Sequence, residues 1–170
     1  AESGLVHRLD RDTSGLVLAA TDHATYRRVR EMFSHRKVEK HYLALVEGRV
    51  SEAFSVDVPL ARRRSRVVAA RSSDHRLHAS TRVALLDCGK DWSLVTASMV
   101  TGVTHQVRAH LSLAGHPLIG DGKYGGPPAP PATRRGQLLH ALRVKFAGGP
   151  DLSAPVPHDM LTALRSLRTR

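Results

Sequence analysis

Apolar runs and segments of helical spacing alternate in the first third of the chain. The purely apolar run GLVLAA at 15–20 predicts a buried strand, because both faces of such a segment need cover. Apolar residues then recur at helical spacing, which predicts a helix from Thr21 or Asp22, either a good N-cap, to about His35. The pattern therefore begins as a strand followed by a helix.

Most of the later pattern has the period of strands. These segments are rich in β-branched residues or alternate apolar and polar positions, and glycine, proline or charged clusters separate them. No segment repeats another, so a solenoid or propeller is not indicated. The expected strands are 39–48, 54–60, 78–87, 92–100 and 138–148.

Helical spacing returns twice in the second half. Apolar side chains at i, i+4 and i+7 predict a short helix at 104–114, and Gly115 stands where a helix C-terminal glycine belongs. Arg108 falls on another face of this helix, so we expect it to point toward a different element. The proline-rich segment 125–136 predicts a loop, and 157–170 predicts a closing helix with a basic outer face.

Length and composition indicate one ordinary globular domain. The chain has 170 residues, 41% of them hydrophobic and 24% charged, which suits a packed core and not a disordered segment. Its single cysteine, Cys88, excludes an internal disulfide framework and any multi-cysteine metal site. No apolar run is long enough to span a membrane, and the N-terminus lacks a signal-peptide core, so we expect a soluble cytoplasmic protein.

The charge balance indicates a polyanionic partner. Lysine and arginine total 26 against 15 acidic residues, which gives a net charge of +11. Such a cation attracts nucleic acid and gains affinity from counterion release at phosphates. Arginine supplies most of the excess, including Arg62, Arg63 and Arg64 of ARRRSR and the pair Arg134–Arg135. Each run alone is equally typical of a solvated loop, so the total carries the argument.

Four segments, in one order, resemble the motifs of the RluA-type pseudouridine synthases, members of the RluA/RsuA superfamily. They are HRLDRDTSGLVLAA at 7–20, KHYLALVEG at 40–48, TGVTHQVRAHLSLAGHPLIGDGKYGG at 101–126 and LLHALRVKF at 138–146. The resemblance implies an RNA uridine isomerase whose catalytic domain covers 1–170. It also implies an α+β fold in which a mixed, largely antiparallel curved sheet with flanking helices carries a central catalytic cleft.

The resemblance assigns three catalytic residues. Asp10 matches the family's catalytic aspartate, which acts at C1′ or C2′ of the target nucleotide while the base is detached, turned and rejoined through C5. Arg108 matches the arginine that holds this carboxylate in its ionised form and orients it. Tyr42 matches the tyrosine that stacks on the target base, and a phenol or phenolate there could also accept the C5 proton. Such a site needs a flipped-out or unpaired uridine.

Other polar residues are candidates for RNA contacts or for support of the site. We expect Arg8 to contact phosphate or brace its loop, Thr13 to shape the turn that presents Asp10, and His105 to orient the start of its helix. The full set of expected substrate or RNA contacts is Arg8, Thr13, His105, Gln106, Arg62, Arg63 and Arg64. No cofactor or metal is expected, because the histidine spacing fits no zinc motif.

The chain departs from the family pattern in two places. Val103 stands where the family usually has a basic residue, which removes one potential RNA contact. The upstream strands usual in the family, with their KPAG-like segment, and the S4 domain that often precedes them are missing before Asp10, so we expect an N-terminally truncated catalytic domain. A noncatalytic RNA-binding module and a basic protein that binds RNA incidentally stay open as alternatives. The target, ribosomal or transfer RNA, is also open, and we expect a monomer.

Overall fold

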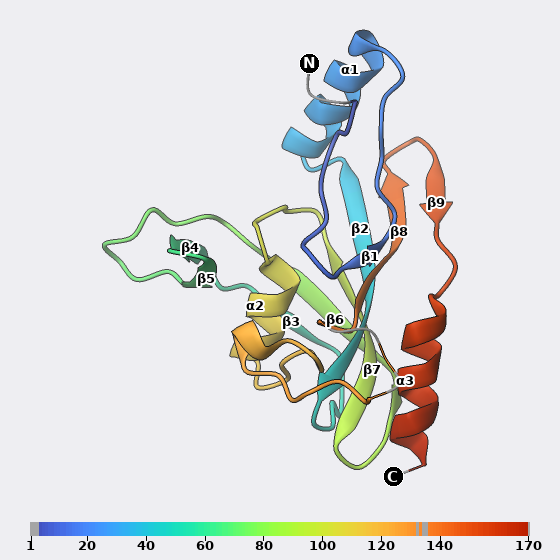
Figure 1. The fold of residues 1–170 in the computed structure, drawn as a ribbon. Coiled ribbons are helices and arrows are strands. Elements are labelled where there is room, and N and C mark those ends of the chain that lie inside the picture. The colour runs from blue at the N-terminus through green and yellow to red at the C-terminus, as the bar shows by residue number, and fades with distance from the viewer. Residues whose placement is uncertain (1–3, 132, 134–135, 170) are drawn as a thin grey trace.

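The computed structural model describes residues 4–131, 133 and 136–169, so Arg134 and Arg135 of the predicted loop lie outside the described residues. Figure 1 shows a twisted sheet with helices on its faces and at one end. The helices are α1 (His23–Ser34), α2 (Gln106–Leu113) and α3 (His158–Arg168), with a short 3-10 helix, η1 (Gly122–Tyr124). The strands are β1 (Ser14–Gly15), β2 (Val38–Glu47), β3 (Phe54–Val56), β4 (Leu60–Arg63), β5 (Arg66–Ala69), β6 (Thr81–Cys88), β7 (Trp92–Met99), β8 (Leu139–Phe146) and β9 (Asp151–Ser153).

The large sheet has the order β1-β8-β2-β7-β6-β3, and β9 also pairs with β8. Only the β1–β8 pair is parallel, and the other pairs are antiparallel. A bulge between His41 and Tyr42 shifts the register of β2 against β8. The expected α+β fold with a mixed, largely antiparallel sheet is confirmed.

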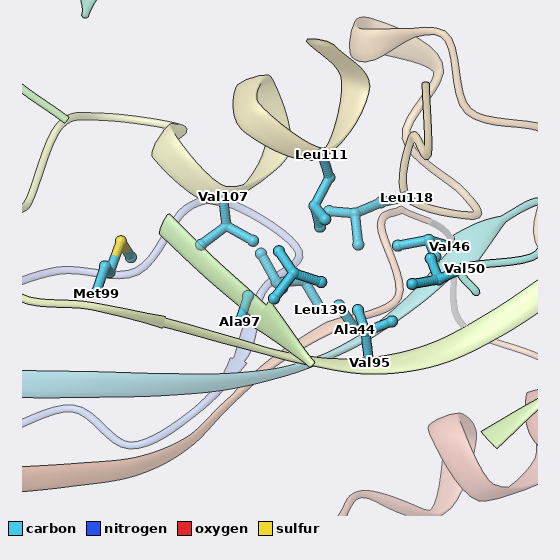
Figure 2. Close-up of a cluster of buried hydrophobic side chains, with 11 residues drawn as sticks. Ala44, Val46, Val50, Val95, Ala97, Met99, Val107, Leu111, Leu118 and Leu139 are labelled. Carbon is cyan, nitrogen blue, oxygen red and sulfur yellow. The ribbon is translucent and has the colours of Figure 1, made fainter. Parts of the chain in front are cut away.

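Helices α2 and α3 cover opposite faces of this sheet (Figure 1). On one face Val107 and Leu111 of α2 pack on sheet residues such as Ala44 and Val95 in a tightly buried cluster (Figure 2). On the other face Met160 of α3 belongs to a second buried cluster. The amphipathic spacing that predicted these helices therefore reflects real packing against the sheet.

The helices and four of the predicted strands lie close to where the sequence places them, and β6 matches the predicted 78–87 within three residues at each end. Asp22 is the N-cap of α1, with its side chain accepting a hydrogen bond from the backbone of Thr25. Strands β2, β7 and β8 match the predicted 39–48, 92–100 and 138–148 within two residues at each end.

The predicted buried strand at 15–20 is wrong. Strand β1 covers only Ser14 and Gly15, and Val17 is 43% exposed. Strand β8 offers β1 only two positions, because β9 pairs with β8 at Arg143–Lys145, further along the same edge. The apolar run instead packs Leu16 and Leu18 against the cluster beneath α1.

The predicted strand at 54–60 is divided, and the arginine-rich run that follows is not a loop. Val56 ends β3 and Leu60 begins β4, with Pro59, which has no backbone N–H, between them. Strands β4 and β5 then form a separate two-stranded hairpin. Its apolar side chains Leu60 and Val67 are buried beside α2, and its arginines face solvent.

Candidate active site

Asp10 lies in a tight loop between the N-terminal segment and β1. The backbone N–H of Thr13 donates to the carbonyl of Asp10, and Asp12 adopts a left-handed conformation with φ 68°. Buried Gln137 fixes the loop from β8's side, since its amide donates to the carbonyl of Arg11 at 2.6 Å and to Thr13 Oγ1 at 3.0 Å. These bonds hold the carboxylate at the mouth of a cleft.

Arg108 connects helix α2 to this loop. It is buried, and its Nε and Nη2 donate to the two carboxylate oxygens of Asp121 at 2.7 and 2.8 Å. This two-point contact fixes the plane of the guanidinium, and Nη1 then donates to Asp10 Oδ2 at 3.3 Å. One arginine thus bridges two carboxylates that are distant in sequence.

The charges around Arg108 keep it protonated. Burial lowers the pKa of Arg108, but the hydrogen bonds to Asp121 and the charges of Asp121 and Asp10 outweigh this and raise the pKa above its ordinary value. The guanidinium also lies over the ring of Tyr124, 5.1 Å from its centroid. The cation is therefore permanent, and it can stabilise an ionised carboxylate throughout a reaction.

Tyr42 lies in the wall of the cleft, on the face of β2 that α2 covers. Burial raises the pKa of Tyr42 to about 12, and the negative charge of Asp10 contributes to the rise. The resting side chain is therefore a neutral phenol at physiological pH, and the phenolate considered from the sequence is disfavoured. Its ring remains available for stacking on a base.

The cleft has a volume of about 440 Å³, enough for one nucleoside. Of the residues expected from the sequence, it brings together Asp10, Tyr42 and Arg108, and its lining also includes Arg8, Thr13, His105 and Gln106.

His105 precedes α2 in a left-handed conformation, as the N-cap residue, and so occupies the predicted helix start. Its Nε2 lies 4.0 Å from Asp10 Oδ1, and its Nδ1 lies 3.0 Å from the hydroxyl of Tyr124. Burial lowers the pKa of His105, although the charge of Asp10 opposes the shift. A neutral imidazole beside the carboxylate can orient it without neutralising it.

Gln106 lies in the lining of the cleft, but its side chain is hydrogen-bonded to the protein. Its Oε1 accepts from the backbone of Val103, and its Nε2 contacts Ser80 O, Thr81 Oγ1 and Thr101 Oγ1 within 3.1 Å. It is 2% exposed. Gln106 therefore supports the loop before α2, and its RNA contact stays a prediction.

The three hairpin arginines lie away from the cleft. Arg62, Arg63 and Arg64 are exposed, none of them lines the cleft, and Arg63 forms an ion pair with Asp74. Val103, which replaces a basic residue, packs against the apolar cluster of the hairpin. Val103 therefore contributes an apolar contact to this cluster and no positive charge to the cleft.

Sequence reasoning missed four residues of the site. Asp121 and Tyr124 lie in a quoted motif but received no role, although a buried arginine needs a carboxylate partner. Gln137, which holds the Asp10 loop, and Lys40, whose side chain is buried in the cleft wall, carried no spacing signal. The one available signal was that a buried Arg108 needs a carboxylate partner, and Asp121 stands in the same motif.

The described part of the chain carries neither a cluster of metal-ligand side chains nor a membrane-spanning helix. There, no three histidine, cysteine or acidic side chains gather as metal ligands would. Both ring nitrogens of His110 contact protein oxygens instead, Thr81 Oγ1 and Val58 O. None of the helices within 4–131 and 136–169 has the length and apolar character needed to cross a bilayer.

Comparison with known proteins gives a consistent picture. The model of the RNA pseudouridylate synthase family matches residues 1–113. The chain is 38% identical to an RNA pseudouridine synthase of Chloroflexus aurantiacus, over 98% of this chain and 54% of that protein. It is 36% identical to ribosomal large subunit pseudouridine synthase D of Nitrosomonas europaea, over 98% of this chain and 52% of that protein. The chain thus spans about half the length of these curated relatives.

A solved structure supports the fold. The structure of human RNA pseudouridylate synthase domain containing 4 superposes with a TM-score of 0.81 at 26% identity, over 96% of this chain and 75% of that chain.

Proposed function

Because the chain belongs to the RNA pseudouridylate synthase family, we propose that it isomerises uridine to pseudouridine in structured RNA, with Asp10, Tyr42 and Arg108 as its catalytic residues. One observation carries the proposal. The carboxylate of Asp10 lies at the mouth of a cleft of nucleoside size, hydrogen-bonded to an arginine that a second carboxylate, Asp121, holds in place.

The reaction breaks the N1–C1′ bond, turns the uracil and forms a C5–C1′ bond. N1 gains a proton and C5 loses one, so atoms and electrons balance without an external oxidant or reductant. Asp10 can attack C1′ to give an ester, or remove a proton from C2′ to give a glycal. Its Oδ1 accepts no hydrogen bond from the described residues, and this oxygen is open for either step.

Tyr42 is suited to hold the detached base. Its ring offers a stacking face, and its hydroxyl stays protonated while Asp10 is negatively charged. Once Asp10 is esterified, that negative charge disappears, and the phenol becomes a better proton donor than before. If the hydroxyl gives its proton to N1 of the detached uracil, the resulting phenolate can accept the proton that C5 loses.

The substrate is proposed from the relatives' names and from the charge. The relative from Nitrosomonas europaea is named for the ribosomal large subunit, so large-subunit ribosomal RNA is the first RNA to test, with transfer RNA second. The exposed Arg62 and Arg64 suit phosphate contacts around the target. A monomeric catalytic domain over 1–170, working without cofactor in the cytoplasm, completes the proposal.

The test is tritium release from RNA labelled at C5 of uridine. We expect release by this chain and loss of at least about a thousandfold in the Asp10→Asn chain, because the amide is not a nucleophile or base. Asp91→Asn, which alters an exposed aspartate, is the control and should retain release.

The alternatives predict other results. RNA binding without release, at saturating RNA, would support the noncatalytic RNA-binding module. Release that survives Asp10→Asn would remove the carboxylate from the mechanism.

A further inference from the structure

Lys40 is a buried cation in the wall of the cleft. Its side chain lies on the same face of β2 as Tyr42, and the residue is only 8% exposed. Its Nζ donates to the carbonyl of Thr101 and lies over the ring of Phe33, 5.7 Å from the centroid. Among the described residues no carboxylate forms an ion pair with it, in contrast to Arg108.

Burying the ammonium of Lys40 without a counter-charge reduces the free energy of unfolding. Burial lowers the pKa of Lys40 to about 8, because the ammonium has lost water and gained no negative partner. A neutral amine can also donate a hydrogen bond to the carbonyl of Thr101, so the contact with Thr101 does not require the charge. An anion that enters the cleft would supply the missing partner.

The surroundings of Lys40 are arranged for an anion. Gly102 leaves Nζ open, since a side-chain Cβ at that position would lie 3.3 Å from it. Arg8 and Arg30 also line the cleft, and Asp10, the only carboxylate among the described residues of its lining, is paired with Arg108.

Resting on the proposed function, we propose that Lys40 binds a backbone phosphate of the RNA strand next to the target uridine. The ammonium lies beside Tyr42, the residue suited to stack on the base, and the phosphodiester of an extruded nucleotide enters the cleft together with its base. Lys40 is a substrate-binding residue in this proposal and takes no part in bond breaking.

The test measures binding of an RNA heptamer with one central uridine, in the Asp10→Asn chain. Lys40→Met is expected to weaken binding about tenfold or more and to reduce the slope of log affinity against log salt by about 1. The matched control is Lys145→Met, which removes the same charge from an exposed residue on the other face of the sheet and should weaken binding less than about twofold.

Methylphosphonate substitution then identifies the phosphate. Neutralising one phosphate beside the uridine should weaken binding to the Lys40 chain and have little further effect on the Lys40→Met chain, because both changes remove the same contact. Additive losses at every phosphate would overturn the proposal. This binding cycle is independent of tritium release, so its failure and the failure of the proposed function are read separately.

Two further measurements separate phosphate binding from a structural role. Affinity should fall up to about tenfold per pH unit above pH 8, where Lys40 loses its proton, and the Lys40→Met chain should lack this fall. The neighbouring His7 and His105 have lowered pKa values, chiefly through burial, and Tyr42 has a raised one, so none of them titrates in this range.

Urea unfolding gives the second measurement. The Lys40→Met chain should unfold at no lower urea concentration than the original, because its buried charge is gone. Marked destabilisation with an unchanged salt slope would assign Lys40 to the support of Thr101. If that chain does not fold, Lys40→Arg, which keeps the charge, should retain the salt slope, and its loss would contradict the proposal.

Discussion

At the scale of single residues, the site depends on how Arg108 divides its donors between two carboxylates. Asp121 takes Nε and Nη2 at 2.7 and 2.8 Å, and Asp10 receives only Nη1 at 3.3 Å. The tighter pair is the buried one, since Asp121 is 2% exposed. Asp121 is therefore a positioning residue, and Asp10 keeps a loosely held carboxylate that can react.

Asp121→Asn should cost both stability and turnover. The substitution leaves a buried guanidinium without its counter-charge, which we expect to lower the free energy of unfolding by about 3 kcal/mol. It also frees the guanidinium to rotate toward Asp10, and turnover should fall about 100-fold, with a smaller change in KM. Urea unfolding and steady-state tritium release measure the two effects.

Asp91→Asn is the matched control for that substitution, because Asp91 is exposed. Equal effects of the two substitutions on turnover would show that Asp121 does not position Arg108.

The sequence indicated the proposed catalytic residues but not the residues that support them. Asp10, Tyr42 and Arg108 stand in motifs with a recognisable order, and the fold brings them to one cleft. The roles of Asp121 and Lys40 depend on burial, which a pattern of residue types does not encode.

At the scale of elements, the shortest strand, β1, joins the Asp10 loop to the sheet. Its Gly15 has φ +115°, and a Cβ there would lie 2.3 Å from the carbonyl oxygen of Ala141 in β8. Only glycine permits the two backbones to approach so closely. The loop that presents Asp10 is therefore anchored by a residue that has no side chain.

Gly15→Ala should separate β1 from β8. We expect a loss of about 2 kcal/mol or more in the free energy of unfolding and a larger proportional loss of turnover, because the Asp10 loop moves away from Arg108. The control is Gly122→Ala, where a Cβ would meet nothing within 4 Å. Similar stabilities for the two variants would contradict this account.

Element prediction succeeded where packing follows local periodicity. Helix α2 and strands β2, β7 and β8 carry a regular pattern because each buries one defined face or both. The prediction of a strand at 15–20 failed because β9, which lies far along the chain, pairs with the same edge of β8 and so limits the length of β1. Competition for one sheet edge leaves no trace in the local sequence.

At the scale of the whole molecule, the cations of the cleft and the exposed arginines of the β4–β5 hairpin place positive charge in two separate regions. The hairpin lies to the side of α2, apart from the large sheet (Figure 1). Arg62 and Arg64 are exposed there, and Arg63 is paired with Asp74. Composition predicted a polyanionic partner, but the positions of the cations, some on the hairpin and others in the cleft, follow only from the fold.

Replacing Arg62 and Arg64 together with serine should weaken binding of any RNA, regardless of sequence. Each lost phosphate contact reduces the salt slope by about 1, so the double variant should lose about 2. Anisotropy titrations at several salt concentrations, on ribosomal and transfer RNA fragments, measure this. A loss restricted to one sequence would instead indicate base recognition by the hairpin.

One hydroxyl connects the hairpin to the reacting centre. Tyr124 Oη accepts from the backbone of Val67 in β5 at 2.9 Å and lies 3.0 Å from Nδ1 of His105, at the start of the helix that carries Arg108. A strand of RNA that displaces the hairpin must stretch or break this shared contact. Docking at the hairpin and alignment of the guanidinium are then thermodynamically linked, and by reciprocity the factor by which RNA on the hairpin changes the affinity of the cleft is the factor by which a nucleotide in the cleft changes the affinity of the hairpin.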